Sequence, residues 1–402
     1  MIWRRCFANR LSRSGSGAIS CFMAPADCPP VPSIPTGPGP MSPTPCSHPP
    51  SGADAPGLAQ VAASLAGSPV QSLRQAGHGG NSRLYRVETE DGVRALKLYP
   101  PRGADGRDRL AHERAGLGFL HRHGAPVPRL LGADPEAGAA LLEWVDGPPP
   151  PEGEGCDAMI GFLKHLHGLR HAPDAAGLPQ AVEACPSAAE LLRQIEGRRI
   201  RLAMVAEEPE NGDLARLLDE RFDPAAGRLR DRLSRLYDLA RIDVQTPTAR
   251  RNLTLSPSDF GLHNALSRAD GSIVFIDFEY FGWDDPVKLV ADTLWHPGMR
   301  LSAATRSRFL KAAGTVYGND PGFAVRLASQ IGFFGLRWCL IVLSDFLPER
   351  WAHRAGAGAD GTWTDARRIQ AEKANALLDR VSCILSIDPM DWPAAFHRAG
   401  HG

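Results

Sequence analysis

The chain has 402 residues, of which 43% are hydrophobic and 22% are charged, values typical of a folded globular protein rather than a disordered or collagen-like chain. Its 45 basic and 45 acidic residues leave no net charge, which argues against a nucleic-acid partner held by bulk positive charge. The eight cysteines form no C-x-x-C pair, which argues against zinc ribbons. Four lie in the first 46 residues and four are scattered through the rest, which is typical of a reducing compartment, so we expect a cytoplasmic protein.

The first 56 residues are predicted to form a disordered, proline-rich tail. Residues 24–56 contain 12 prolines in 33 residues. Such a segment cannot bury enough apolar surface to offset the entropy that it would lose on ordering. We therefore expect the folded part of the chain to begin at residue 57.

Residues 57–147 are predicted to form a small, β-rich lobe. The Asp91-Gly92 pair lies between two runs of alternating polarity, which is a strong signal for a hairpin turn. The pattern indicates an antiparallel sheet with one inserted helix. The expected elements are a helix over 57–66, strands over 70–77, 82–90 and 93–100, a helix over 105–123, and strands over 129–133 and 139–145.

Residues 148–390 are predicted to form a larger helical lobe, followed by a tail at 391–402. A run of four prolines after Gly147 separates the two lobes. The fold class is therefore α+β with two lobes, an arrangement that often places ligands between the lobes. The expected elements are helices over 156–170, 187–207, 211–242, 286–297, 302–316, 322–346 and 364–386, and a strand over 272–277.

The most apolar stretch of the chain, residues 331–347, lies within one of these helices. Arg337 and Asp345 interrupt it, so it contains no run of about 18 uncharged apolar residues. We expect a buried helix here and no membrane partner.

A glycine-rich loop and the strand that follows it suggest a phosphate site. Gly77, Gly79 and Gly80 join two predicted strands, where glycines let backbone amides approach an anion closely. Strand alternation then places Ala95 and Lys97 on one face, so an adenine could pack on Ala95 with its phosphates near Lys97. Taken singly, the loop is explained at least as well by an ordinary hairpin, and Lys97 is explained better as a solvent-exposed lysine at a strand edge.

The inserted helix carries an acidic residue on its apolar side. Glu113 precedes Leu117 and Leu120 by four and seven residues, which places all three on one stripe. A carboxylate that faces the core requires a partner, and Lys97 is the obvious candidate.

The strongest motif is D-x-x-x-x-N, from Asp259 to Asn264, followed by the predicted strand that leads to Asp277. Phosphoryl transfer needs a carboxylate near the attacking hydroxyl and oxygen ligands for Mg²⁺. Asp259 could supply the first, and Asn264 and Asp277 the second. The motif alone is common, but it is rarely preceded by a glycine loop, a strand lysine and a helix glutamate in this order.

This order of motifs, with Glu143-Trp144-Val145 between them, resembles the aminoglycoside phosphotransferase and choline kinase family, which has a protein-kinase-like fold. The resemblance covers about residues 70–345. It implies that Lys97 holds the α- and β-phosphates of ATP while Glu113 orients it. It further implies that the backbone of Glu143 to Val145 binds adenine, that Asp259 is the catalytic base, and that Asn264 and Asp277 bind Mg²⁺.

The chain departs from the family pattern at two places. The catalytic loop commonly reads H-G-D but here reads Pro257-Ser258-Asp259, so the histidine that helps brace the loop is missing. Asp277 is followed by Phe278-Glu279 rather than Phe-Gly, which is usual in small-molecule kinases. Together with the missing Ala-Pro-Glu element, this variation disfavours a protein kinase.

The sequence gives thinner evidence about the acceptor. Glu279, Trp283 and Asp284 combine acids with an aromatic ring and could hold a cationic amine or stack on a sugar, although such aromatics more often fill the core. We expect an ATP- and Mg²⁺-dependent kinase of a small-molecule hydroxyl, such as an aminoglycoside, a sugar or an amino alcohol. The alternative is a nucleotide-binding pseudokinase with a regulatory role, which the retained Asp259, Asn264 and Asp277 disfavour.

Overall fold

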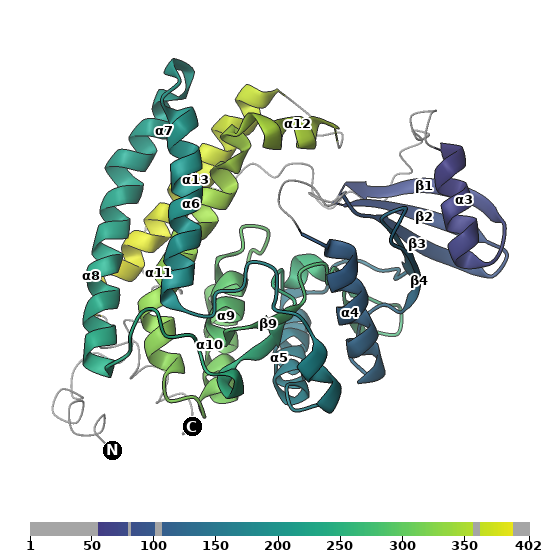
Figure 1. Cartoon of the computed structure of the whole chain (residues 1–402), viewed down its shortest axis with the longest axis horizontal. Helices are drawn as coiled ribbons and strands as arrows, with labels where there is room; N and C mark the ends of the chain where they lie inside the picture. The colour runs from purple at the N-terminus through teal and green to yellow at the C-terminus, as the bar shows by residue number, and fades with distance from the viewer. Residues whose placement is uncertain (1–54, 79–81, 101–106, 357–361, 389–402) are drawn as a thin grey trace.

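The computed structural model of the protein describes residues 55–78, 82–100, 107–356 and 362–388 (Figure 1). The predicted tails at 1–56 and 391–402 lie outside these ranges, except that the first helix already begins at Ala55. Gly79 and Gly80 of the glycine-rich loop also lie outside the described residues.

The N-terminal part is a five-stranded antiparallel sheet in the order β1-β2-β3-β5-β4, with one helix on each side. Its elements are α3 (Ala55–Ala66), β1 (Val70–His78), β2 (Arg83–Thr89), β3 (Gly92–Leu98), α4 (Arg109–Arg122), β4 (Leu130–Asp134) and β5 (Ala139–Glu143).

The two faces of strand β3 contact different parts of the molecule. Leu96 and Leu98 pack with the α3 side of the sheet, whereas Ala95 belongs to the core that continues into α4 and the helical part. The predicted hairpin between β2 and β3 is confirmed, since Thr89 pairs with Gly92, whose φ of +114° favours glycine. Lys97 therefore points, like Ala95, toward the helical part of the molecule.

The C-terminal part consists mainly of helices, with two short two-stranded sheets, β6–β9 and β7–β8. Its helices are α5 (Glu152–Leu169), α6 (Ala188–Ala206), α7 (Gly212–Arg216), α8 (Asp223–Ala240), α9 (Pro286–Trp295), α10 (Ala303–Tyr317), α11 (Phe323–Val342), α12 (Pro348–Gly356) and α13 (Trp363–Leu385), and its strands are β6 (Thr254–Ser256), β7 (Ala265–Ser267), β8 (Ile273–Phe275) and β9 (Gly282–Asp284).

Helix α11 is the central element of this part, because α6, α8, α9 and α13 all pack against it (Figure 1). The indole of Trp295 in α9 donates a hydrogen bond to the Ile331 carbonyl at 2.8 Å. In the described part of the chain, Phe323–Phe346 is the one helical stretch that is long and apolar enough to cross a membrane by length and composition, and 83% of its apolar window is buried inside the protein. The predicted buried helix is confirmed.

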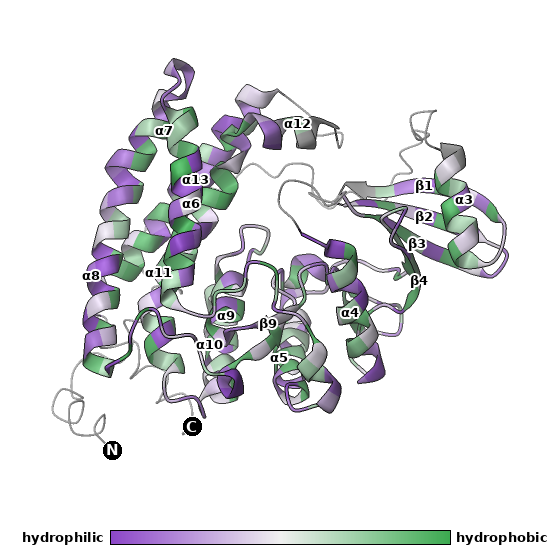
Figure 2. Cartoon of the chain, viewed as in Figure 1, coloured by the Kyte–Doolittle hydropathy of each residue, from purple (hydrophilic) through white to green (hydrophobic). Residues whose placement is uncertain are grey.

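The outer helices bury only one side. Along α8, hydrophilic and hydrophobic residues are interspersed (Figure 2), and Leu229, Leu233 and Leu236 are among its buried residues. An amphipathic helix of this kind is stabilised by packing its apolar stripe on the core.

Several predicted boundaries were wrong. The helix expected over 211–242 is divided by a π-helical turn at Leu217–Phe222, and the strand expected over 139–145 ends at Glu143. Helix α4 begins only at Arg109, where the Asp108 side chain accepts a hydrogen bond from the amide of Ala111 at 3.0 Å. Helix α12 and the three-residue strands β6, β7 and β9 were not predicted.

Candidate active site

The D-x-x-x-x-N segment forms a compact loop between β6 and β7. The Asn264 side chain donates a hydrogen bond to the backbone carbonyl of Asp259 at 3.0 Å, which closes the loop on itself. Strand β7 pairs with β8, and the amide of Ile276 donates to the Asn264 carbonyl at 2.9 Å. This pairing brings Asn264 next to the segment that carries Asp277.

Ser258 precedes the candidate base in a conformation that favours glycine. Its φ is +66°, and its amide donates to the Ser256 hydroxyl at 3.0 Å. A residue with a Cβ is strained in this left-handed region, which explains why the middle position of the family motif is commonly glycine. The Lys288 ammonium donates to the Ser258 hydroxyl at 3.3 Å and supports the loop from α9.

Two histidines hold the carboxylate of Asp259. The Nε2 atoms of His263 and His296 lie 2.9 Å and 3.3 Å from the same oxygen, Oδ1. The two imidazole rings are stacked, with centroids 3.8 Å apart and planes inclined by 4°. The carboxylate is therefore fixed without the histidine that precedes it in the family motif.

The hydrogen bonds define the proton position on one of these rings. The amide of Gly298 donates to Nδ1 of His296 at 3.1 Å, so a neutral His296 carries its proton on Nε2, facing Asp259. Burial and the neighbouring His263 lower the pKa of His296 to about 4, so the ring is neutral at pH 7. Although burial alone would raise the pKa of Asp259, the hydrogen bond from His263 lowers it, and the carboxylate is ionised.

A second cluster surrounds the ammonium group of Lys97, which lies 2.6 Å from Glu113, 2.8 Å from Asp277 and 3.2 Å from Glu279. Glu113 also accepts hydrogen bonds from the Tyr99 hydroxyl at 2.6 Å and the Phe278 amide at 3.1 Å. Burial alone would lower the pKa of Lys97, but Asp277 and Glu113 hold it well above its usual range. The predicted Lys97–Glu113 pair is confirmed.

The carboxylates of this cluster are candidate metal ligands. Glu113, Asp277 and Glu279 offer oxygens that lie within 4.8 Å of one another. Glu113 and Glu279 are buried, whereas 36% of the Asp277 side chain is exposed. Partial burial and the neighbouring carboxylates raise the pKa of Asp277, against the effect of Lys97, so a further cation near it would be favoured.

The predicted nucleotide residues lie at the edges of this cluster. Ala95 is buried beside Lys97 on β3, and Gly77 lies near the end of β1, paired with Leu84. The amide of Glu143 donates to the Arg129 carbonyl at 2.9 Å, so it is not available to adenine. A hinge role would therefore fall to the Glu143 carbonyl and to Val145, which follows the end of β5.

Two of the predicted substrate residues are structural, and their assignment is corrected here. Trp283 is 3% exposed and donates from Nε1 to the Ala175 carbonyl at 2.9 Å. Asp284 is 1% exposed and accepts the Cys185 amide at 2.9 Å. Glu279 is also buried, where it accepts a hydrogen bond from the Ser82 hydroxyl at 2.7 Å, so it belongs to the Lys97 cluster. Trp283 and Asp284 thus satisfy interior groups rather than face a ligand.

A cavity of about 1070 Å³ opens beside the candidate base, and Ser258, Asp259 and His296 are among the residues that line it. Sequence reasoning missed most of its lining, notably Glu183 and Arg337. Glu183 lies in the loop before α6 and Arg337 lies in α11. The two are far apart in the sequence, so no local motif could have predicted that they line one cavity.

The comparisons with known proteins show the family and the fold of the chain. The model of the phosphotransferase enzyme family matches residues 72–324. Choline kinase LicA from Streptococcus pneumoniae superposes with a TM-score of 0.50 at 16% identity, over 81% of this chain and 98% of that one. A putative aminoglycoside phosphotransferase from Ralstonia eutropha gives a TM-score of 0.50 at 16% identity, over 78% and 93% of the two chains. These similarities confirm the two-lobed, kinase-like α+β fold.

One curated protein is similar to a shorter part of the chain. The EKC/KEOPS complex subunit BUD32 of Chaetomium globosum is 32% identical over 118 residues, which are 27% of this chain and 40% of that protein. The chain thus matches about two fifths of the length of this relative.

Proposed function

Because the chain belongs to the phosphotransferase enzyme family, we propose that it is a cytoplasmic, ATP- and Mg²⁺-dependent kinase that phosphorylates a hydroxyl of a small molecule. The observation that carries this proposal is the pairing of β7 with β8, which joins the loop of the candidate base, Asp259, to the segment of the Lys97 cluster. Aminoglycosides, sugars and amino alcohols are the acceptor classes to consider first. The proposed reaction involves neither a nucleic acid nor a membrane.

The Lys97 cluster would bind the phosphates of the nucleotide. The ammonium is held by Glu113 at 2.6 Å and is buried, so its position is fixed before a nucleotide arrives. A fixed positive charge stabilises the charge of the transferred group without reorganisation. Adenine would pack on Ala95 and meet the backbone near Val145, with Gly77, Gly79 and Gly80 over the phosphates.

The residues present fit Mg²⁺, which prefers carboxylate and amide oxygens. Asp277, the exposed carboxylate of the cluster, and the side-chain oxygen of Asn264 would hold the ion, because the side-chain nitrogen of Asn264 is used by the Asp259 carbonyl. When bound, the ion would neutralise charge on the phosphate oxygens.

Asp259 would accept the proton of the acceptor hydroxyl. The acceptor oxygen forms a bond to the γ-phosphorus, the bond from that phosphorus to the bridging oxygen breaks, and ADP leaves with the bonding electrons. The acceptor proton passes to Asp259 and then to solvent, which balances the reaction. An ionised carboxylate held by His263 and His296 suits this role, because its orientation is set in advance.

The proposal is tested by measuring ATP consumption by the purified protein against panels of hydroxylated amines, sugars and aminoglycosides. Asp259→Asn is nearly isosteric and should leave nucleotide affinity unchanged, while turnover should fall by about 10²–10⁴-fold, the scale of a lost positioned base. Binding of ATP and Mg²⁺ without transfer to any acceptor, and no effect of Asp259→Asn, would replace the kinase by a regulatory nucleotide-binding protein.

A further inference from the structure

The cavity beside Asp259 carries an excess of positive charge. Among the described residues that line it, seven are lysine or arginine and four are aspartate or glutamate. Three of the four acids have basic partners among the lining residues. Glu190 lies 2.6 Å from Arg193, Asp292 lies 3.2 Å from Lys288, and Glu183 contacts three arginines. Three of the seven basic residues, Arg193, Arg201 and Arg350, are exposed, whereas Arg107, Arg198, Lys288 and Arg337 are buried or half-buried in the cavity wall.

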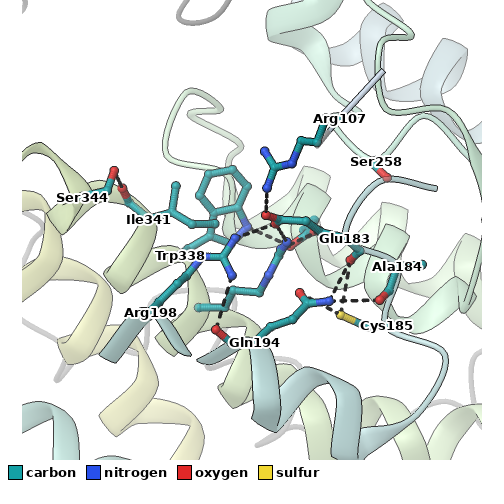
Figure 3. Close-up of polar contacts among 12 residues, drawn as sticks. Arg107, Glu183, Ala184, Cys185, Gln194, Arg198, Ser258, Trp338, Ile341 and Ser344 are labelled. Atoms are coloured by element: carbon teal, nitrogen blue, oxygen red, sulfur yellow. Dashed lines mark hydrogen bonds and ion pairs between the residues drawn. The ribbon is translucent and has the colours of Figure 1, made fainter. Parts of the chain in front are cut away.

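Part of this charge is concentrated at one point, where three arginines contact Glu183; Figure 3 labels two of them, Arg107 and Arg198. In the figure, Arg107 approaches Glu183 from the segment that precedes α4, and Arg198 approaches it from α6. Arg198 and Arg337 each lie 2.6 Å from the same oxygen, Oε2, and Arg107 contacts the other oxygen. Three separate segments of the chain thus place guanidinium groups around a single carboxylate.

One of these guanidinium groups, that of Arg337, has a donor that no described residue uses. Arg337 is 4% exposed, yet its Nε is buried without a hydrogen-bond acceptor in the described part of the chain. Burial lowers the pKa of Arg198, and repulsion from Arg337 and Arg107 adds to this effect against the attraction of Glu183. An anion bound beside Arg198 would favour its charged form.

We propose that the acceptor of this enzyme carries an anionic group, a carboxylate or a phosphate, which binds to the Arg107–Arg198–Arg337 cluster while its hydroxyl meets Asp259. The inference rests on the proposed kinase function and names its substrate class. Guanidinium groups bind both kinds of anion through paired hydrogen bonds. A polycationic acceptor would instead enter a cavity whose wall repels it.

Four acceptors of one carbon skeleton test the charge preference: glucose 6-phosphate, gluconate, glucose and glucosamine. We expect kcat/KM to be at least tenfold higher for one of the two anionic compounds than for glucose, and lowest for glucosamine. The two anionic compounds distinguish phosphate from carboxylate. A preference for glucosamine over both anions would overturn the inference while leaving the kinase function intact.

Two variants locate the anion site. Arg198→Gln and Arg107→Gln should each raise KM for the anionic acceptor by roughly 10-fold or more, as expected when a charged hydrogen bond is lost, with KM for ATP unchanged. Arg199→Gln is the matched control, because Arg199 is the next residue of α6 but binds Asp219 and Asp223 instead. Equal effects of Arg198→Gln and Arg199→Gln would contradict the assignment.

A binding measurement separates this inference from the proposed function if no acceptor in the series is phosphorylated. Inorganic phosphate is titrated into the protein saturated with a non-hydrolysable ATP analogue and Mg²⁺, and the shift in melting temperature is recorded. Phosphate should stabilise the wild type and Arg199→Gln but not Arg198→Gln or Arg107→Gln. The absence of stabilisation in the wild type, or equal stabilisation in all four proteins, would reject the anion site.

Discussion

At the scale of single residues, the orientation of Asp259 depends on side chains that come after it in the chain. His263 lies four residues later in the same loop, and His296 follows the end of α9. Both lie close to Oδ1, and the rings of His296 and Trp338 meet edge to face, with centroids 4.6 Å apart. The stacked imidazoles thus link the candidate base to α11 and compensate for the non-histidine residue before Ser258.

Loss of the hydrogen bond from His263 should lower turnover without weakening nucleotide binding. His263→Phe retains a ring that can stack on His296 but removes the donor at 2.9 Å from Asp259. We expect kcat for the best acceptor of the screen to fall by about 10- to 100-fold, the scale of one hydrogen bond to a charged group. His263→Gln, which restores a donor, should recover part of this loss. A kcat within twofold of the wild type would remove His263 from the positioning of Asp259.

Lys97 and Glu113 should behave as one unit in nucleotide binding. Lys97→Ala removes the fixed charge, and Glu113→Ala releases the ammonium from a contact of 2.6 Å. Because both changes disrupt the same contact, the double variant should bind ATP hardly more weakly than the worse single variant. Isothermal titration with ATP and Mg²⁺ measures the three affinities. Additive losses would show that the pair has no joint role.

At the scale of elements, helix α4 sets the position of Glu113 through its contact with the segment after Asp277. The ring of His112 lies with Nδ1 3.0 Å from the Phe281 carbonyl, and Glu113 accepts the Phe278 amide. Gly116 allows this close approach, because a Cβ there would meet the Phe281 side chain at 2.9 Å. The helix and the candidate metal segment therefore pack directly against each other.

A larger residue at this contact should displace α4. Gly116→Val should lower the free energy of unfolding by about 1–3 kcal/mol, the usual cost of overpacking, and should raise KM for ATP because Glu113 shifts. Gly118→Ala on the same helix is the control, since its Cβ would meet only the Arg122 guanidinium at an ordinary 3.6 Å. That variant should be neutral or more stable by up to about 1 kcal/mol. Urea unfolding and steady-state kinetics check both variants, and equal stabilities would contradict the packing argument.

Elements with a strong local pattern were predictable from the sequence, whereas those that depend on tertiary contacts were not. The β2–β3 hairpin has a turn pair between alternating runs, and the apolar length of α11 marks a buried helix. Strand β9, with three residues, exists because Leu255 of β6 pairs with Trp283. No periodicity can be read from so short a segment.

In the candidate site, too, features with a local sequence pattern were predictable and features that depend on tertiary contacts were not. The pairing of Lys97 with Glu113 could be predicted because helix and strand periodicity fix the faces of both residues. The roles expected for Trp283 and Asp284 could not be judged, because composition does not reveal whether a polar group finds an interior partner. The arginine cluster around Glu183 joins three distant segments and leaves no local signal.

At the scale of the whole molecule, polar contacts join the β-rich and helical parts at several places. Ser82 binds Glu279, His123 binds Asp174 at 2.9 Å, and the amide of Phe275 donates to the Pro126 carbonyl at 2.9 Å. Arg107 adds a contact to Glu183, which lies in the helical part at a left-handed φ of +55°. Glu183 thus connects the parts and holds the arginine cluster together, at the cost of backbone strain.

This central position predicts how stability depends on pH. Burial alone would raise the pKa of Glu183, but Arg337, Arg198 and Arg107 hold it well below its usual range. A carboxyl group whose pKa is lowered by folding stabilises the protein above its unfolded pKa, about 4.3 for glutamate, and this contribution is lost as the pH falls. Glu183→Gln should therefore be clearly less stable than the wild type at pH 7, and the difference should shrink steadily from pH 5 to pH 3.

Urea unfolding at pH 7, 5, 4 and 3 measures this difference in the free energy of unfolding. The carboxyl groups that the two proteins share titrate alike in both, so their contributions cancel in the difference. Glu372→Gln serves as the control, because it removes an exposed pair with Arg368 on α13 and should change stability by less than about 1 kcal/mol at every pH. If the gap between the wild type and Glu183→Gln stayed constant with pH, the destabilisation would come from shape and packing. The charge of Glu183 would then have no part in holding the three arginines, and the cluster would be stable without a counter-ion.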